Sequence, residues 1–122
     1  MVLQRRPVST EEAAVIRAAL ARAATGAVAE TVVAGIRSLE VVDRCPCGCD
    51  SVQFAVPDGA PRAAPIADGV GKTPRGGQVG VLVFATGAFI KELEVYDLGA
   101  GDDDLRLPLP DSIRSWNDAA AV

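Results

Sequence analysis

The chain has 122 residues, 49% of them hydrophobic and only 4% aromatic, and its formal net charge is −4. A chain of this length builds one hydrophobic core, so we expect a single domain over residues 1–122. The acidic balance, with no basic cluster longer than Arg5-Arg6, excludes a general nucleic-acid-binding protein, because phosphate binding requires a stripe of Lys and Arg. No apolar run is long enough to cross a bilayer, so we expect no membrane partner.

Residues 9–26 have the pattern of an amphipathic helix. Ser9 can cap its first amides, Glu12 completes a capping box, and Gly26 is expected to end it. The apolar side chains at helical spacing are Ala13, Ile16, Leu20 and Ala24. In residues 27–36 apolar side chains recur four apart, which predicts a second, short helix, although β-branched residues and a glycine weaken this interpretation.

Two segments with period-two alternation follow, at residues 38–44 and 50–57, and each predicts a half-buried β-strand. Val52 and Phe54, for example, share one face of the second strand. Between the two segments stands Cys45–Cys49, with the sequence CPCGC, whose proline and glycine favour a turn. We therefore predict that this pentapeptide connects the two strands of an antiparallel hairpin.

A second hairpin is predicted after a long loop. Residues 57–78 are rich in proline and glycine, so we expect a loop with at most a short edge strand near Ala63–Ala67. Val79–Phe84 is apolar on both faces and is expected at the centre of the sheet. Thr86-Gly87 is predicted to make the turn into a return strand, within a stretch that ends at Leu98, in which Leu93 and Val95 face the core.

The tail is proline-rich and short of regular patterns. Asp102–Asp104 is most simply a solvated acidic loop, and one helical turn is expected within Asp111–Trp116, capped by Asp111 or Ser112. Helices that precede hairpins are typical of an α+β fold. We predict that an N-terminal helix, with a second short helix, packs on a four- to five-stranded antiparallel sheet built from two hairpins.

The only three cysteines of the chain, Cys45, Cys47 and Cys49, carry its strongest chemical signal. Thiols two residues apart in a tight loop can converge on one soft cation, such as Zn²⁺ or Cu⁺, and the CPCG sequence is similar to a zinc knuckle. A structural zinc site needs four ligands, so Asp43, Asp50, water or another subunit would supply the fourth. The simpler interpretation, which we favour from the sequence, is that the cysteines pack as small apolar residues beside the turn.

The expected compartment follows from the thiols and from the start of the chain. The first ten residues contain a basic pair but no apolar segment behind it, as a secretory signal would require. An odd number of cysteines does not suggest a disulfide framework. We therefore expect a cytoplasmic protein whose thiols stay reduced.

Catalysis has little support in the sequence. The chain contains no histidine, which removes the commonest general base and the ordinary nucleophilic triads. Glu92, Glu94 and Tyr96 share one face of the last long strand. They would form an acid–base group if they lined a cavity, but we favour the solvated face of a sheet. We expect no enzymatic activity, and we predict that this face, together with Trp116, is an interaction surface.

Three segments together resemble a group of small bacterial proteins of uncharacterised function. They are Cys-Pro-Cys-Gly-Cys at residues 45–49, the valine-rich VGVLVF at residues 79–84, and Leu-Glu-Val-Tyr at residues 93–96. The similarity runs from about Arg44 to Leu109. It implies that the cysteines belong to a shared Cys-x-Cys-Gly-Cys pattern and that the strands follow in the predicted order, and it implies no activity for this chain.

Two functions stay open at this point. The first is a non-enzymatic binding or interaction module that associates with a protein partner or with a second copy of itself. The alternative is a thiol-based metal-binding protein, for zinc or copper, or a redox protein, that uses Cys45, Cys47 and Cys49. The sequence identifies no small-molecule ligand.

Overall fold

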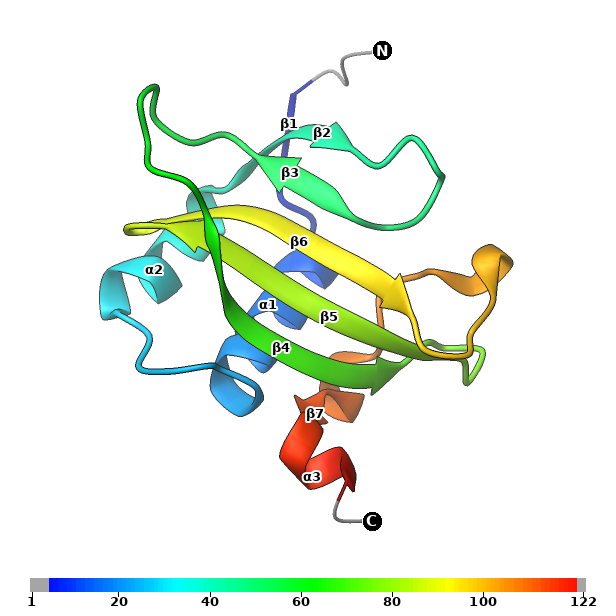
Figure 1. Ribbon diagram of the computed structural model, residues 1–122. Coiled ribbons are helices and arrows are strands. Elements are labelled where there is room, and N and C mark those ends of the chain that lie inside the picture. The colour runs from blue at the N-terminus through cyan, green and yellow to red at the C-terminus, as the bar shows by residue number, and fades with distance from the viewer. Residues whose placement is uncertain (1–4, 121–122) are drawn as a thin grey trace.

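The computed structural model describes residues 5–120, which form one seven-stranded sheet with helices (Figure 1). The α-helices are α1 (Thr10–Arg22), α2 (Glu30–Ala34) and α3 (Trp116–Ala120). The short 3₁₀ helices are η1 (Gly35–Ser38), η2 (Asp102–Asp104) and η3 (Pro110–Ser112). The strands are β1 (Arg6–Pro7), β2 (Glu40–Arg44), β3 (Val52–Phe54), β4 (Ala64–Lys72), β5 (Gln78–Thr86), β6 (Phe89–Asp97) and β7 (Arg114–Ser115).

The strands lie in the order β1-β2-β3-β6-β5-β4-β7, and every neighbouring pair is antiparallel. Helix α1 lies across one face of the sheet, as Figure 1 shows. The predicted α+β class and the N-terminal helix on an antiparallel sheet are therefore confirmed. The sheet has more strands than the predicted four to five, because β4 and the two-residue strands β1 and β7 extend it. Among residues 5–120, no helix has the length and apolar character needed to cross a bilayer.

The prediction of a loop over residues 57–78 is wrong for Ala64–Lys72, where β4 pairs with β5 along nearly its whole length. The short edge strand expected near Ala63–Ala67 is the first part of this longer strand, which lies between β5 and β7. Strands β4, β5 and β6 thus form a three-stranded meander instead of a single hairpin. The misleading residues were glycines. A Cβ at Gly69 would lie 2.8 Å from the Cβ of Ala23, and one at Gly71 would lie 2.8 Å from the Cβ of Pro108. These glycines therefore mark places where other segments approach the strand closely.

Helix α1 begins as predicted and ends earlier. The Ser9 side chain accepts a hydrogen bond from the Glu12 amide, and the Glu12 carboxylate accepts one from the Ser9 amide, which is the predicted capping box. The helix ends at Arg22, not at Gly26, because the next residues pair with β4: the Ala23 carbonyl accepts from the Asp68 amide. Ala24 is consequently exposed instead of belonging to the apolar stripe.

The core lies between α1 and the sheet. Ile16 and Ala19 of α1 are fully buried, and they belong to one apolar cluster with Val81, Val83 and Leu93 of the central strands. The predicted second helix is present as α2 followed by η1, and it adds Val32 and Ile36 to the same cluster. The helix face of the sheet is therefore apolar across β5 and β6.

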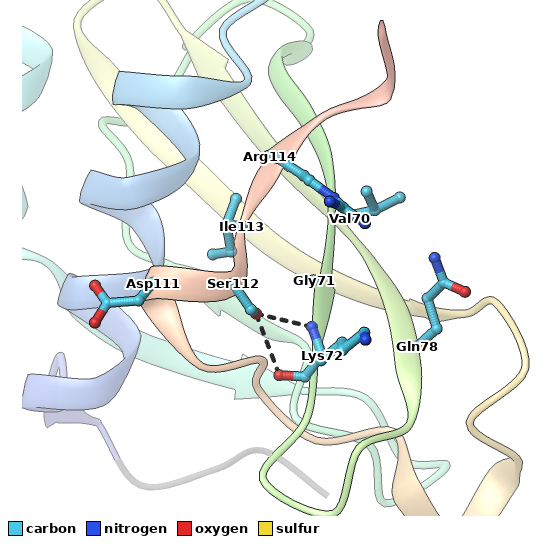
Figure 2. A pocket seen from close by; sticks show the side chains of 8 residues that line it. All are labelled: Val70, Gly71, Lys72, Gln78, Asp111, Ser112, Ile113 and Arg114. Carbon is cyan, nitrogen blue, oxygen red and sulfur yellow. Dashed lines mark hydrogen bonds between the residues drawn. The ribbon is translucent and has the colours of Figure 1, made fainter. Parts of the chain in front are cut away.

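The tail differs from the prediction in two places. No helical turn spans residues 111–116; η3 and the edge strand β7 precede α3, which begins at Trp116. The Ser112 hydroxyl accepts a hydrogen bond from the Lys72 amide at 2.8 Å instead of capping a helix, at the edge of a hollow of about 300 Å³ (Figure 2). Asp104 is also not solvated: it is 6% exposed and accepts a hydrogen bond from the Thr73 hydroxyl at 2.7 Å.

Candidate metal centre

The pentapeptide Cys45–Cys49 connects β2 to β3, as predicted. The strands pair up to Arg44 and Val52, and the Cys45 amide donates to the Ser51 carbonyl at 3.1 Å, which closes the base of the loop. The Gly48 amide donates to the Cys45 carbonyl at 3.3 Å and makes a tight turn. Gly48 has φ +90°, a conformation that side chains other than glycine rarely adopt. The loop is thus folded back on itself by its own backbone.

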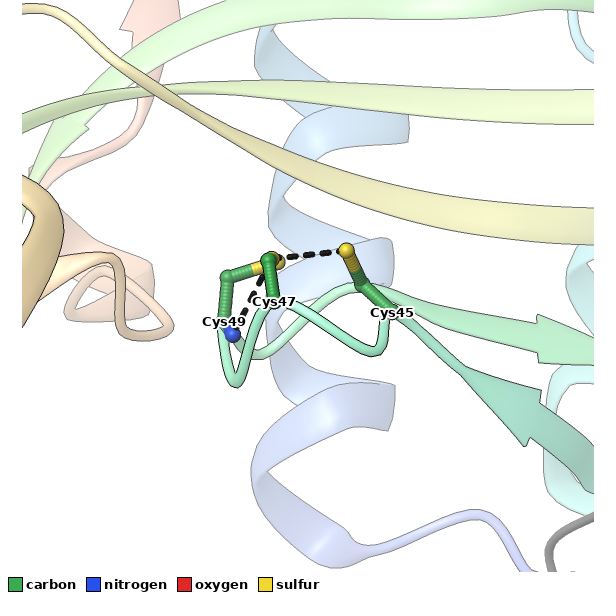
Figure 3. A group of neighbouring side chains, drawn as sticks. All are labelled: Cys45, Cys47 and Cys49. Carbon is green, nitrogen blue, oxygen red and sulfur yellow. Dashed lines mark hydrogen bonds between the residues drawn. The ribbon is translucent and has the colours of Figure 1, made fainter. Parts of the chain in front are cut away.

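This fold gathers the three thiols at one point (Figure 3). The Sγ atoms of Cys45, Cys47 and Cys49 all lie within 4.8 Å of one another. The Cys45 and Cys47 Sγ atoms are 2.7 Å apart, and the Cys49 amide donates to the Cys47 Sγ at 3.4 Å. Cys47 is exposed, whereas Cys45 and Cys49 are half-buried. The cysteines therefore converge on one another at the surface, beside the turn. That they pack there only as small apolar residues stays a prediction.

Residues 105–107, which we call the bracing segment, fix the loop from one side. The Asp50 amide donates to the Leu105 carbonyl at 3.0 Å, and the Leu107 amide donates to the Asp50 carboxylate at 2.8 Å. Arg106 Nη1 lies 3.3 Å from the same carboxylate and 3.4 Å from the Gly48 carbonyl. The Asp50 carboxylate is therefore already engaged, and of the two predicted additional ligands Asp43 is the less encumbered, since its carboxylate accepts only the Arg44 amide among the described residues.

The thiols open onto a hollow of about 440 Å³ that is also lined by Glu92, Glu94 and Tyr96 of β6. The two groups that the sequence suggested separately, the cysteines and the β6 face, thus lie on one cavity. Its other charged lining residues are Asp43, Arg44 and Asp97. Four carboxylates against one guanidinium make the hollow attractive to cations.

Burial disfavours the charged forms of two β6 side chains, Glu92 and Tyr96. Burial raises the pKa of Glu92 above its ordinary value, the neighbouring Glu94 raises it further, and Lys91 opposes the shift. Burial also raises the pKa of Tyr96, to about 12, with a further contribution from its hydrogen bond to Asp68. Tyr96 is therefore a neutral hydrogen-bond donor at physiological pH.

Tyr96 and Trp116 both donate a hydrogen bond to Asp68, a residue that the sequence analysis did not identify. The Tyr96 ring lies over Gly80, where a Cβ would overlap it, and its hydroxyl donates to Asp68 Oδ1 at 3.0 Å. Trp116 Nε1 donates to the same oxygen at 2.9 Å. Asp68 stands in the glycine-rich stretch expected as a loop, so no sequence signal singled it out. That Glu92, Glu94, Tyr96 and Trp116 form an interaction surface stays a prediction.

A second, apolar hollow of about 540 Å³ lies between the start of α1 and the tail. Ala14, Val15, Leu107 and Pro108 are among its lining residues, and the buried Asp104 stands at its wall. Asp104 Oδ1 has no hydrogen-bond partner among the described residues. In the part of the chain that the structure describes, the cysteine trio is the group of three side chains whose ligand atoms are close enough to share an ion.

No protein-family model matches the chain, and no curated protein and no solved structure matches it significantly. The resemblance of residues 44–109 to small bacterial proteins with a Cys-x-Cys-Gly-Cys segment therefore stays a prediction, and the function is argued from the site alone.

Proposed function

We propose that this protein is a non-enzymatic binding protein whose ligand is one soft metal ion, Zn²⁺ or Cu⁺, held by Cys45, Cys47 and Cys49. The observation that carries the proposal is the convergence of the three Sγ atoms within 4.8 Å of one another. Thiolates are the protein ligands that these ions prefer, and three of them on one short loop can reach a common ion at about 2.3 Å each after small side-chain rotations.

The backbone of the loop supports the proposal, because its own hydrogen bonds hold the cysteines close together. Gly48 permits the turn, and the Cys49 amide already points at the Cys47 sulfur. An amide that donates to a sulfur stabilises the negative charge that the sulfur carries as a metal ligand. The bracing segment holds Asp50, directly after the last cysteine. Little conformational entropy is therefore lost when the ion binds.

The fourth coordination position would face the acidic hollow. Asp50 is engaged by the Leu107 amide and by Arg106, so it is poorly placed to supply a further ligand. Asp43 or a solvent molecule in the hollow would complete a zinc site, whereas Cu⁺ needs no fourth ligand when three thiolates surround it. The carboxylates of Glu92 and Glu94 favour the approach of either cation.

The test is the metal content of protein purified without added metal, together with the absorption spectrum after Co²⁺ addition. We expect about one ion per chain and the intense visible and near-ultraviolet bands of a thiolate-bound cobalt. Both should vanish in a variant with all three cysteines changed to serine, and each single Cys→Ser change should weaken binding at least about tenfold.

A matched pair of glycine variants separates loop geometry from general stability. Gly48 (φ +90°) and Gly76 (φ +89°) both adopt the left-handed conformation, and a Cβ at either position would meet no atom within 4 Å. Gly48→Ala and Gly76→Ala should therefore cost a similar amount of stability, on the order of 1 kcal/mol. Only Gly48→Ala should weaken metal binding. Equal metal affinity in the two glycine variants would contradict the proposal. So would a wild-type protein that is purified without metal and shows no thiolate–cobalt bands after Co²⁺ is added.

A further inference from the structure

Two of the three sulfurs lie closer to each other than a shared ion requires. The Sγ atoms of Cys45 and Cys47 are 2.7 Å apart. Two sulfurs bound at about 2.3 Å to a tetrahedral zinc are separated by about 3.8 Å, whereas a disulfide bond is about 2.0 Å long. The two thiols are therefore in direct contact, and a small rotation of either side chain brings the sulfurs to disulfide distance.

We propose that Cys45 and Cys47 form a reversible disulfide within the loop, by exchange with a low-molecular-weight disulfide such as oxidised glutathione, and that Cys49 remains a thiol. This modification site concerns the metal-free loop, so it goes beyond metal binding and does not rest on it.

The exposure of the thiols assigns their order of reaction. Cys47 is the exposed cysteine, so its thiolate meets the external disulfide first, attacks one sulfur and releases one glutathione thiolate, which takes a proton from solvent. The half-buried Cys45, whose thiol donates to the Cys47 Sγ, then attacks that sulfur as a thiolate and displaces the second glutathione. The protein loses two electrons and two protons, and the external disulfide becomes two thiols.

The backbone of the loop favours this pairing over the pairing of Cys47 with Cys49. The hydrogen bond from the Gly48 amide to the Cys45 carbonyl holds Cys45 and Cys47 in one tight turn. Cys49 approaches the Cys47 Sγ with its backbone amide at 3.4 Å, and the following residue, Asp50, is fixed by the bracing segment. Cys45 therefore contacts the Cys47 Sγ with its own sulfur, whereas the hydrogen bond from Cys49 comes from its backbone amide.

The experiment uses metal-free protein incubated with oxidised glutathione, followed by alkylation of remaining thiols and intact-mass measurement. The wild-type chain should lose the mass of two hydrogen atoms and keep one alkylatable thiol. Cys49→Ser should lose the same mass and keep none. Cys45→Ser should instead accumulate the mixed disulfide with glutathione, which should disappear at least about tenfold more slowly than in Cys49→Ser.

Two results would overturn the assignment. If Cys45→Ser resolves its mixed disulfide as fast as Cys49→Ser, the pair is Cys47 with Cys49. If all three proteins accumulate only mixed disulfides, no disulfide forms within the loop. Because metal is absent, neither result bears on metal binding. Wild-type protein that first receives one equivalent of Zn²⁺ should react at least about tenfold more slowly if the metal proposal is also correct.

Discussion

The two faces of the sheet differ in composition and in what they can do. The face under α1 is apolar, and Ile16 of the helix and Val83 of the sheet are fully buried there. The opposite face carries Glu92, Glu94 and Tyr96, and at its edge the cysteine loop opens onto the same hollow. Stability and proposed chemistry are thus separated. Substitutions on the covered face should change the free energy of unfolding, and substitutions around the hollow should chiefly change metal binding.

The largest effect on stability is expected from Ile16→Ala. The side chain is fully buried between α1 and the sheet, so its truncation leaves a cavity and should lower the free energy of unfolding by about 3 kcal/mol in urea titrations. Val33→Ala, at a position that is 43% exposed, is the matched control and should change it by less than about 0.5 kcal/mol. Metal content should be unchanged in both folded proteins. A loss below about 1 kcal/mol for Ile16→Ala would contradict the described core.

Glu12→Gln should have an intermediate effect that depends on pH. Burial raises the pKa of Glu12, but the hydrogen bonds from Arg6 and Ser9 lower it more, so that the net pKa lies below its ordinary value. The ionised carboxylate therefore stabilises the protein above pH about 4.3, and this contribution is lost as the pH falls through the lowered folded-state pKa. We expect a cost of about 1–2 kcal/mol at pH 7 that shrinks in acid.

The control for Glu12 is Glu40, which forms an exposed ion pair with Arg5 at 2.9 Å. Glu40→Gln should cost less than about 0.5 kcal/mol at pH 7, because solvent screens exposed pairs. The free energies of unfolding of both variants and of the wild-type protein would be measured in urea at pH 7 and pH 3. Equal costs for the two variants, or a cost for Glu12→Gln that grows in acid, would be inconsistent with the buried capping box.

The smallest effect on stability, with the opposite sign, is expected from Glu92→Gln in the hollow. Burial and Glu94 raise the pKa of Glu92, so its charged form is disfavoured in the folded protein at neutral pH. The substitution should therefore stabilise the metal-free protein by less than about 1 kcal/mol at pH 7, with the gain disappearing below the ordinary pKa. It should also weaken metal binding a few-fold, measured by chelator competition. Tighter metal binding by the variant would show that the hollow does not attract the ion.

Local signals predicted local structure well. The capping box of Ser9 and Glu12 needs only residues three apart, and the turn at Cys45–Cys49 needs only its own proline and glycine. Both could therefore be derived from the sequence, and so could the placement of Leu93 and Val95 on the covered face. The convergence of the thiols follows from that turn.

Features that depend on distant segments could not be predicted. The glycines of β4 are explained by Ala23 and Pro108, and Asp104 is buried because Thr73 lies beside it. Asp68 accepts a hydrogen bond from the Tyr96 hydroxyl only because the Tyr96 ring lies over Gly80, on a different strand. The meeting of the cysteines with the β6 carboxylates likewise depends on the pairing of β3 with β6, which no local pattern encodes.

The most direct test of the central claim, that three thiols share one ion, is X-ray absorption at the metal edge of the loaded protein. We expect about three sulfur neighbours at about 2.3 Å, reduced to two in each single Cys→Ser variant that still binds. A first shell made mainly of oxygen or nitrogen atoms, or a sulfur count that is unchanged when any one cysteine is replaced, would contradict it.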